Sequence, residues 1–330
     1  HPDHPELLNT LSTALQTRFE QHGMQSDLDE VILFHQEALS LCSAPHHGHF
    51  KLLNNLAASL LTHYDQQGEL NDINDAVSLL QEAFVLCPIS HPHHPISLSN
   101  LASALHIHFE WQGAMSDLDD AMSLNWQALE NHHSSHPDYF ATLDNHGITL
   151  QAHFDQYGTL SDLDEAIHFH WEALKYCPTG HSVHPAVLNN LAIALCTNCK
   201  QQQSAPQDLD EAIWLIKEAL EVVELGNAGH SELLNTLGSA LQMQFEQLGT
   251  LGDLHQAISL SREAIMLFQP SQLQYSTLLQ GLLKGLELQF SKGGSMAFIE
   301  SPTTLKKIHS WALTNFPLVL RAQHNLKGDP

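Results

Sequence analysis

The chain has 330 residues, and 43% of them are hydrophobic, which is enough for a substantial packed core. Its 12 Lys and Arg residues stand against 37 Asp and Glu, giving a formal net charge of −25 with histidine neutral. A surface this acidic repels phosphate backbones, so we expect no nucleic-acid binding and favour a basic or neutral partner. No apolar run approaches the roughly 18 residues that a membrane-spanning helix requires, so no membrane span is expected.

The first predicted element is an amphipathic helix. Its apolar residues Leu8, Leu11, Leu15 and Phe19 recur at helical spacing and therefore share one face. The opposite face carries the polar residues Asn9, Thr13, Gln16 and Glu20. A glycine, Gly23, follows and is expected to end the helix in the left-handed conformation that glycine adopts readily.

A second predicted helix begins at Ser26-Asp27, whose side chains are expected to cap its N-terminus and complement its dipole. Its buried face contains Leu28, Val31, Ile32, Ala38, Leu39 and Cys42. Histidine and proline then dominate the linker, and proline prevents the helix from continuing. The pattern therefore predicts a pair of antiparallel helices of about 16–18 residues each.

This pair repeats along the chain. The first-helix motif ends at positions 11, 56, 101, 146, 191, 237 and 282, which is a period of 45 residues with one step of 46. We predict an all-α solenoid, a right-handed superhelix of about seven antiparallel helix pairs, over residues 1–294. Units start near 1, 46, 91, 136, 181, 227 and 271. Residues 295–330 are predicted to form a degenerate last helix that caps the array.

The five cysteines do not form a disulfide framework, because their number is odd and three of them occupy one recurring apolar position (Cys42, Cys87 and Cys177). This usage predicts a reducing, cytoplasmic setting. The opening segment His1–Pro5 is similar to the His-Pro linkers between repeats. We therefore expect the chain to be a piece of a longer protein, cut at a repeat boundary, and its terminal repeats to offer surfaces for self-association.

The second unit contains a run Leu-Asn-Asn-Leu-Ala over 53–57, then Gly68, Asp75-Ala76-Val77, Glu82–Phe84 and Pro88. This pattern resembles the tetratricopeptide repeat (TPR), lengthened from 34 to 45 residues. The His-Pro linker followed by this run is similar to the kinesin light chain subgroup. The fuller phrase resembles the repeat regions of large proteins of mushroom-forming fungi, which often carry a caspase-like CHAT domain. The resemblance covers residues 1–270 strongly and 271–294 weakly.

The resemblance implies a concave surface, lined by first helices, that grips a peptide or a helix of a partner protein. Asparagines at the matching first-helix position often bind the backbone of the held segment, and they correspond here to Asn55, Asn100, Asn145 and Asn190. One residue earlier lie Asn9, Asn54, Asn189 and Asn235. The groove-facing positions of the first helices hold no Lys or Arg; they are Thr13, Gln16, Ala58, Leu61, Ser103, His106, Ile148, Gln151, Ile193 and Cys196. A clamp for a partner's C-terminal carboxylate is therefore not expected.

Each candidate also has a simpler interpretation. The asparagines can instead bond the backbone of a neighbouring repeat and fix the stacking angle. The histidine clusters 91–94 and 132–136 can bind zinc, nickel or copper, but their irregular spacing favours solvated loops. His63, His108 and His153 are interpreted as a helix surface row, and the core position of His35, Asn125 and His170 as satisfied buried polar groups.

No catalytic pattern is present in the sequence. The pair Cys196 and Cys199 lacks the second cysteine pair of a zinc site and the βαβ context of a redox site. There is no phosphate-binding glycine loop and no fixed carboxylate pair. We therefore predict a non-enzymatic protein-interaction scaffold without cofactor or metal. Two alternatives remain, a histidine-rich metal-binding protein and a regulatory arm for a CHAT protease outside this chain.

Overall fold

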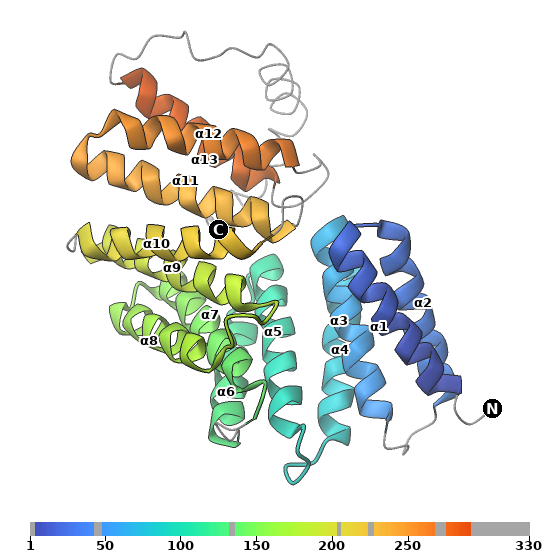
Figure 1. Ribbon diagram of the computed structural model, residues 1–330. Helices are drawn as coiled ribbons and strands as arrows, with labels where there is room; N and C mark the ends of the chain where they lie inside the picture. The colour runs from blue at the N-terminus through green and yellow to red at the C-terminus, as the bar shows by residue number, and fades with distance from the viewer. Residues whose placement is uncertain are drawn as a thin grey trace, which may run out of the picture. The chain divides into compact units, whose positions relative to one another are not determined.

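The structure is a computed structural model that describes residues 4–42, 48–131, 136–202, 206–223, 228–267 and 275–291. The described residues form thirteen α-helices and no strand (Figure 1). They divide into two compact units, residues 1–203 and residues 204–330. The helices of the first unit are α1 (His4–His22), α2 (Gln25–Leu41), α3 (His49–Gln67), α4 (Leu70–Leu86), α5 (His94–Gln112), α6 (Met115–Asn131), α7 (Tyr139–Tyr157), α8 (Leu160–Tyr176) and α9 (His184–Gln202).

Glycine turns join the two helices of a repeat, as the sequence predicts. Gly68, Gly113 and Gly158 are left-handed, with φ between 69° and 71°, and each N–H donates to the carbonyl of the residue four positions earlier. A residue with a Cβ would be strained in this conformation. The turn is only two residues long, so the second helix must run back along the first. The all-α helix-pair architecture is therefore confirmed.

The predicted caps of the second helices are wrong. Met24, not Ser26, is the N-cap residue of α2, and no side chain there bonds the helix terminus. Asp27, Asp72, Asp117 and Asp162 instead lie inside the first turn, where their charge favours the helix dipole. Their carboxylates are used by side chains of the preceding helix, described below.

The core of each pair combines one large and several small side chains. Leu28, Ile73, Leu118 and Leu163 occupy one repeat position of the second helix and are fully buried. Burial of each contributes roughly 1.5–3 kcal/mol. Alanines at 76, 121 and 166, and again at 83, 128 and 173, are also fully buried. Because alanine projects only a methyl group, neighbouring helices approach closely at these points.

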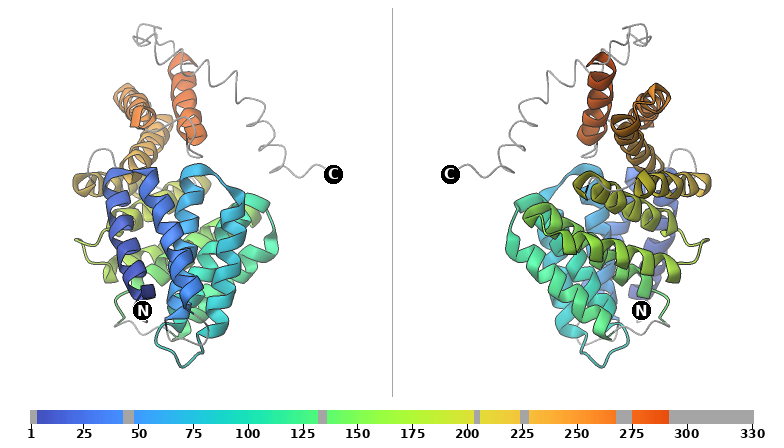
Figure 2. Two further views of the ribbon diagram at one scale, coloured as in Figure 1. Left: turned by 90° about the vertical axis from the view of Figure 1, so that its right-hand side faces the viewer. Right: turned by 90° about the vertical axis from the view of Figure 1, so that its left-hand side faces the viewer.

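Two layers of helices result in the first unit. Each second helix packs against the first helix of its own repeat and against that of the next repeat. Among the described residues, α3 also contacts α5, α5 contacts α7 and α7 contacts α9, whereas the second helices have no comparable contacts with one another. Figure 2 shows the pairs side by side. The first helices therefore form one continuous layer.

The second unit contains α10 (Pro206–Val222), α11 (Ala228–Leu248), α12 (Leu251–Leu267) and α13 (Tyr275–Ser291). Leu234, Leu254, Ile258 and Leu278 belong to a buried cluster that joins α11, α12 and α13. The predicted degenerate last helix, or capping segment, of residues 295–330 lies outside the described residues. None of the described helices combines the length and apolar character needed to cross a membrane.

Candidate functional site

The candidate asparagines form a hydrogen-bonded ladder across the first helices. Asn55 Nδ2 donates to Asn9 Oδ1 at 2.8 Å, and Asn100 Nδ2 donates to Asn54 Oδ1 at 2.9 Å. The same step of 46 residues continues along the chain. Asn145 Nδ2 donates to Ser99 Oγ at 2.9 Å, and Asn190 Nδ2 donates to Asp144 Oδ2 at 3.0 Å. Each rung therefore joins two successive repeats through side chains, rather than through the backbone as the simpler interpretation supposes.

The acceptors Ser99 and Asp144 belong to this ladder but are not among the predicted site residues. Both are buried, at 4% and 8% exposure, while the donors Asn145 and Asn190 are half-buried. A signal for them exists in the sequence, because the position before each of these donor asparagines carries a side-chain oxygen acceptor. Asn189 is buried, and Asn235 lies in the second unit beside Gly281. Contact of any asparagine with a partner remains a prediction.

Exposed and half-buried residues on one side of the first helices form a second candidate surface. We call it the first-helix face and define it by three residues from each of α3, α5, α7 and α9. These residues are Leu61, Thr62, Asp65, His106, Ile107, Glu110, Ile148, Gln151, Asp155, Ile193, Cys196 and Lys200. The acidic residues and Lys200 are exposed, and the others are half-buried.

The environment of this face perturbs its titratable groups. Burial and repulsion from Glu110 raise the pKa of Asp65 to about 6. Burial also raises the pKa of Glu110 and of Asp155, the latter opposed by Lys200. Burial lowers the pKa of His106 to about 4. The carboxylates still touch solvent, so the surrounding protein removes only part of their hydration.

Comparison with known proteins gives structural similarity alone. No protein-family model matches the chain, and no curated protein matches it. Among solved structures, the TPR-like repeats of a kinesin-light-chain-like protein from Podosopora anserina are 18% identical, covering 64% of this chain and 96% of that one, with a TM-score of 0.45. A thermophilic TPR protein from Thermus thermophilus is 20% identical, covering 72% and 99%, with a TM-score of 0.48. PilF of Pseudomonas aeruginosa is 13% identical, covering 87% and 99%, with a TM-score of 0.49.

The fold is a helical solenoid of antiparallel helix pairs. The 45-residue register of the sequence coincides with the turns and the layers of the structure.

Within each helix pair of α1 to α8, a polar side chain of the first helix bonds the start of the second. Arg18 Nε and Nη2 donate a bidentate pair of hydrogen bonds, both 2.6 Å long, to the carboxylate of the buried Asp27. His63 Nδ1 bonds Asp72 at 2.5 Å, and the pairs His108–Asp117 and His153–Asp162 repeat this at 2.6 Å. The predicted histidine surface row is thus half-buried and engaged, not a free surface.

Histidines of the linkers are also structural. His94 lies in the first turn of α5, is buried, and its Nδ1 donates to the carbonyl of Cys87 at 2.7 Å. His49 makes the same bond to Cys42 at 2.8 Å. The burial of His94 departs from the solvated-loop interpretation of the 91–94 cluster, whereas His93 of that cluster is exposed. Most of the 132–136 cluster lies outside the described residues. Among the side chains described, no three His, Cys, Asp or Glu groups are placed to hold a metal ion.

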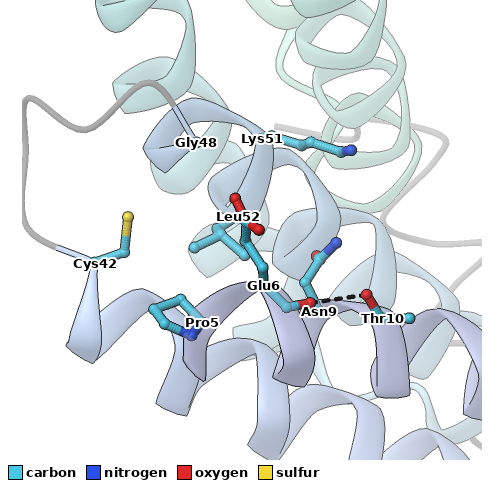
Figure 3. A pocket seen from close by; sticks show the side chains of 8 residues that line it. All are labelled: Pro5, Glu6, Asn9, Thr10, Cys42, Gly48, Lys51 and Leu52. Carbon is cyan, nitrogen blue, oxygen red and sulfur yellow. Dashed lines mark hydrogen bonds between the residues drawn. The ribbon is translucent and has the colours of Figure 1, made fainter. Parts of the chain in front are cut away.

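A pocket of about 280 Å³ opens near the N-terminal end of α1 and α3 (Figure 3). Its lining includes the candidate residue Asn9, and Thr10 beside it donates to the carbonyl of Glu6 at 2.8 Å. The lining residues are Pro5, Glu6, Asn9, Thr10, Cys42, Gly48, Lys51 and Leu52. This set offers no nucleophile paired with a base, and it resembles a cleft between repeats.

The core position of His35, Asn125 and His170 is satisfied on one side only. His170 Nδ1 bonds Asp144 Oδ1 at 2.7 Å, and Asn125 Nδ2 donates to Thr149 Oγ1 at 2.8 Å. The other polar atom of each residue is buried without a partner among the described residues. The Cys196 and Cys199 thiols form no disulfide, and burial together with Cys199 raises the pKa of Cys196 to about 12. A thiol in that state is a poor nucleophile at neutral pH.

Proposed function

We propose that the chain is a protein-interaction scaffold that holds an extended peptide or a helix of a partner protein on its first-helix face. This proposal rests on one observation. Exposed and half-buried side chains recur on one side of a continuous layer of helices. Leu61 also packs against the core cluster of α3 to α6. The three residues of each helix lie within two helical turns of one another, and together the four helices extend the surface beyond the reach of any single helix.

The asparagines of the ladder are proposed to have a second role at this surface. Each amide nitrogen carries two hydrogens, and the rung uses one of them. The second hydrogen and the amide oxygen can bond the backbone of a held segment. We therefore retain Asn55, Asn100, Asn145 and Asn190 as proposed partner contacts. The acidic net charge supports a basic or neutral partner.

One rung of the ladder provides a matched pair of variants. Asn145→Ala and Ser99→Ala remove the same 2.9 Å hydrogen bond from its two ends. Only Asn145 is accessible enough to touch a partner, because Ser99 is buried. The two variants therefore carry the same type of structural defect but differ at the proposed binding surface. Circular dichroism and urea unfolding confirm that both fold.

The chain and both variants are used to capture partners from an extract of the cells that produce it, and the captured proteins are quantified by mass spectrometry. We expect Asn145→Ala to lose a protein that Ser99→Ala keeps. Equal capture by the two variants would show that the ladder is structural only, and would remove the asparagines from the proposed site. The same comparison applies to Asn190→Ala, whose bond ends on Asp144.

A further inference from the structure

The first-helix face has an acidic edge, formed by Asp65, Glu110 and Asp155. They lie at one repeat position, each 45 residues from the next, on the adjoining helices α3, α5 and α7. Among the described residues Asp65 and Glu110 have no hydrogen-bond or ion-pair partner, and burial together with repulsion from Glu110 raises the pKa of Asp65. Aligning unpaired like charges on successive helices disfavours folding, so the fold alone gives no reason for this arrangement.

An apolar strip runs beside this edge. Leu61 lies four residues before Asp65, and Ile107 lies three residues before Glu110, so they share a helix face with the carboxylates. Ile148 and Ile193 lie on α7 and α9 seven residues, about two helical turns, before Asp155 and Lys200, and all four apolar residues are half-buried. An apolar strip with a charged edge is a docking surface for a segment that is apolar on one side and cationic on the other.

We propose that this surface binds a segment of a partner protein in the polyproline II conformation that carries Lys or Arg at every third residue with apolar residues between them. The inference rests on the proposed scaffold function and specifies its partner. Adjoining helix axes lie about 8–10 Å apart. Three residues of a polyproline II helix complete one turn and span about 9 Å, so successive cations lie on one side and meet successive carboxylates.

The acidic edge ends at α9. The equivalent position on α9 is Lys200, which is exposed and whose charge acts on Asp155. A fourth cation of the held segment would meet this ammonium and be repelled. The acidic edge therefore binds three cations, and replacing Lys200 by an acid should extend the edge so that it binds four.

The test uses fluorescently labelled peptides and the full chain. The probe is Lys-Ser-Leu repeated three times, and its control is the same composition with each residue type grouped together. The edge variant is Asp65→Asn, Glu110→Gln and Asp155→Asn. The matched control is Asp75→Asn, Asp120→Asn and Glu165→Gln, on exposed positions of the second helices. Both variants remove three charges, and circular dichroism verifies their folding.

We expect the edge variant to weaken binding of the periodic probe about tenfold or more at low salt, since three ion pairs are lost. The control variant should change it less than about twofold, and the grouped peptide should bind more weakly than the periodic one. Lys200→Glu should strengthen binding of a four-repeat probe. Equal losses from both variants, or no preference for the periodic probe, would overturn the proposal. If neither peptide binds while Asn145→Ala still loses its captured protein, this inference fails and the scaffold function stands.

Discussion

Gly147 in α7 tests how tightly a first helix and a second helix pack. A Cβ built at this position would lie 2.7, 2.8 and 2.9 Å from three ring atoms of His170. Those distances are well inside van der Waals contact. His170 is fully buried and bonds Asp144 at 2.7 Å, so its ring cannot turn toward solvent without breaking that bond.

The Gly147→Ala variant sets two effects against each other. Alanine favours a helix over glycine by roughly 0.5–1 kcal/mol. Overpacking a core costs roughly 1–3 kcal/mol, and losing a bond to a charged group costs roughly 1.5–3 kcal/mol. The second effect wins, and we expect the free energy of unfolding to fall by roughly 3 kcal/mol. Urea unfolding followed by circular dichroism measures it.

The second repeat supplies the control. Ninety residues earlier, the positions of Asp144, Gly147 and His170 hold Asn54, Ala57 and Leu80. Ala57 and Leu80 are both buried in one core cluster, so an alanine fits there when the facing residue is leucine. The triple variant Asp144→Asn, Gly147→Ala, His170→Leu should therefore recover to within about 1 kcal/mol of the original chain. If Gly147→Ala alone raises stability by the amount of its helix propensity, the close approach to His170 does not constrain the fold.

Three further outcomes are expected. Burial lowers the pKa of His35 and of His146 to about 4, so between pH 6.5 and 4 these two histidines gain a proton only in the unfolded state. The free energy of unfolding should therefore fall by about 2 kcal/mol per histidine by pH 5. Unchanged urea midpoints would contradict this. Because the pKa of Asp65 is raised, Asp65→Asn should stabilise the chain slightly at pH 7.5, by less than about 1 kcal/mol for so exposed a group. This gain should fade as the pH falls through 6, where the original carboxyl gains its proton. Thermal melts at both pH values measure the difference. Replacing His94 by Leu removes the hydrogen bond to the Cys87 carbonyl and should lower the free energy of unfolding by about 1–2 kcal/mol, as measured by urea unfolding. An unaltered urea midpoint would contradict this.

The helix pairs could be predicted because their signals are local. Gly68 and its equivalents mark the turns, and the apolar spacing from Leu8 to Phe19 marks the buried face. The cap of α2 could not be predicted this way, because Asp27 has a tertiary partner, Arg18, that competes with the helix terminus for it. A preference for capping is worth about 1 kcal/mol, and a charged partner in a buried position outweighs it.

The candidate site was predictable only in part. The sequence identifies the row Asn55, Asn100, Asn145 and Asn190, but it does not show that each amide donates to the repeat before it. A step of 46 residues becomes a contact only when the stacking of repeats is known. The acidic edge was missed for a related reason. The predicted groove positions of α3, Ala58 and Leu61, lie one to two helical turns before Asp65. The packing of α3 against α5 brings Asp65 near enough to Glu110 for their charges to interact.

The most direct test of the central claim is photo-crosslinking from the two sides of one repeat. A photoreactive amino acid replaces either Thr62, on the first-helix face of α3, or Ser78, exposed on the second helix α4. The chain is then irradiated in extract of the cells that produce it. The scaffold proposal predicts a discrete crosslinked protein from position 62 that is absent from position 78. A crosslink only from position 78, or the same products from both positions, would contradict binding at the first-helix face.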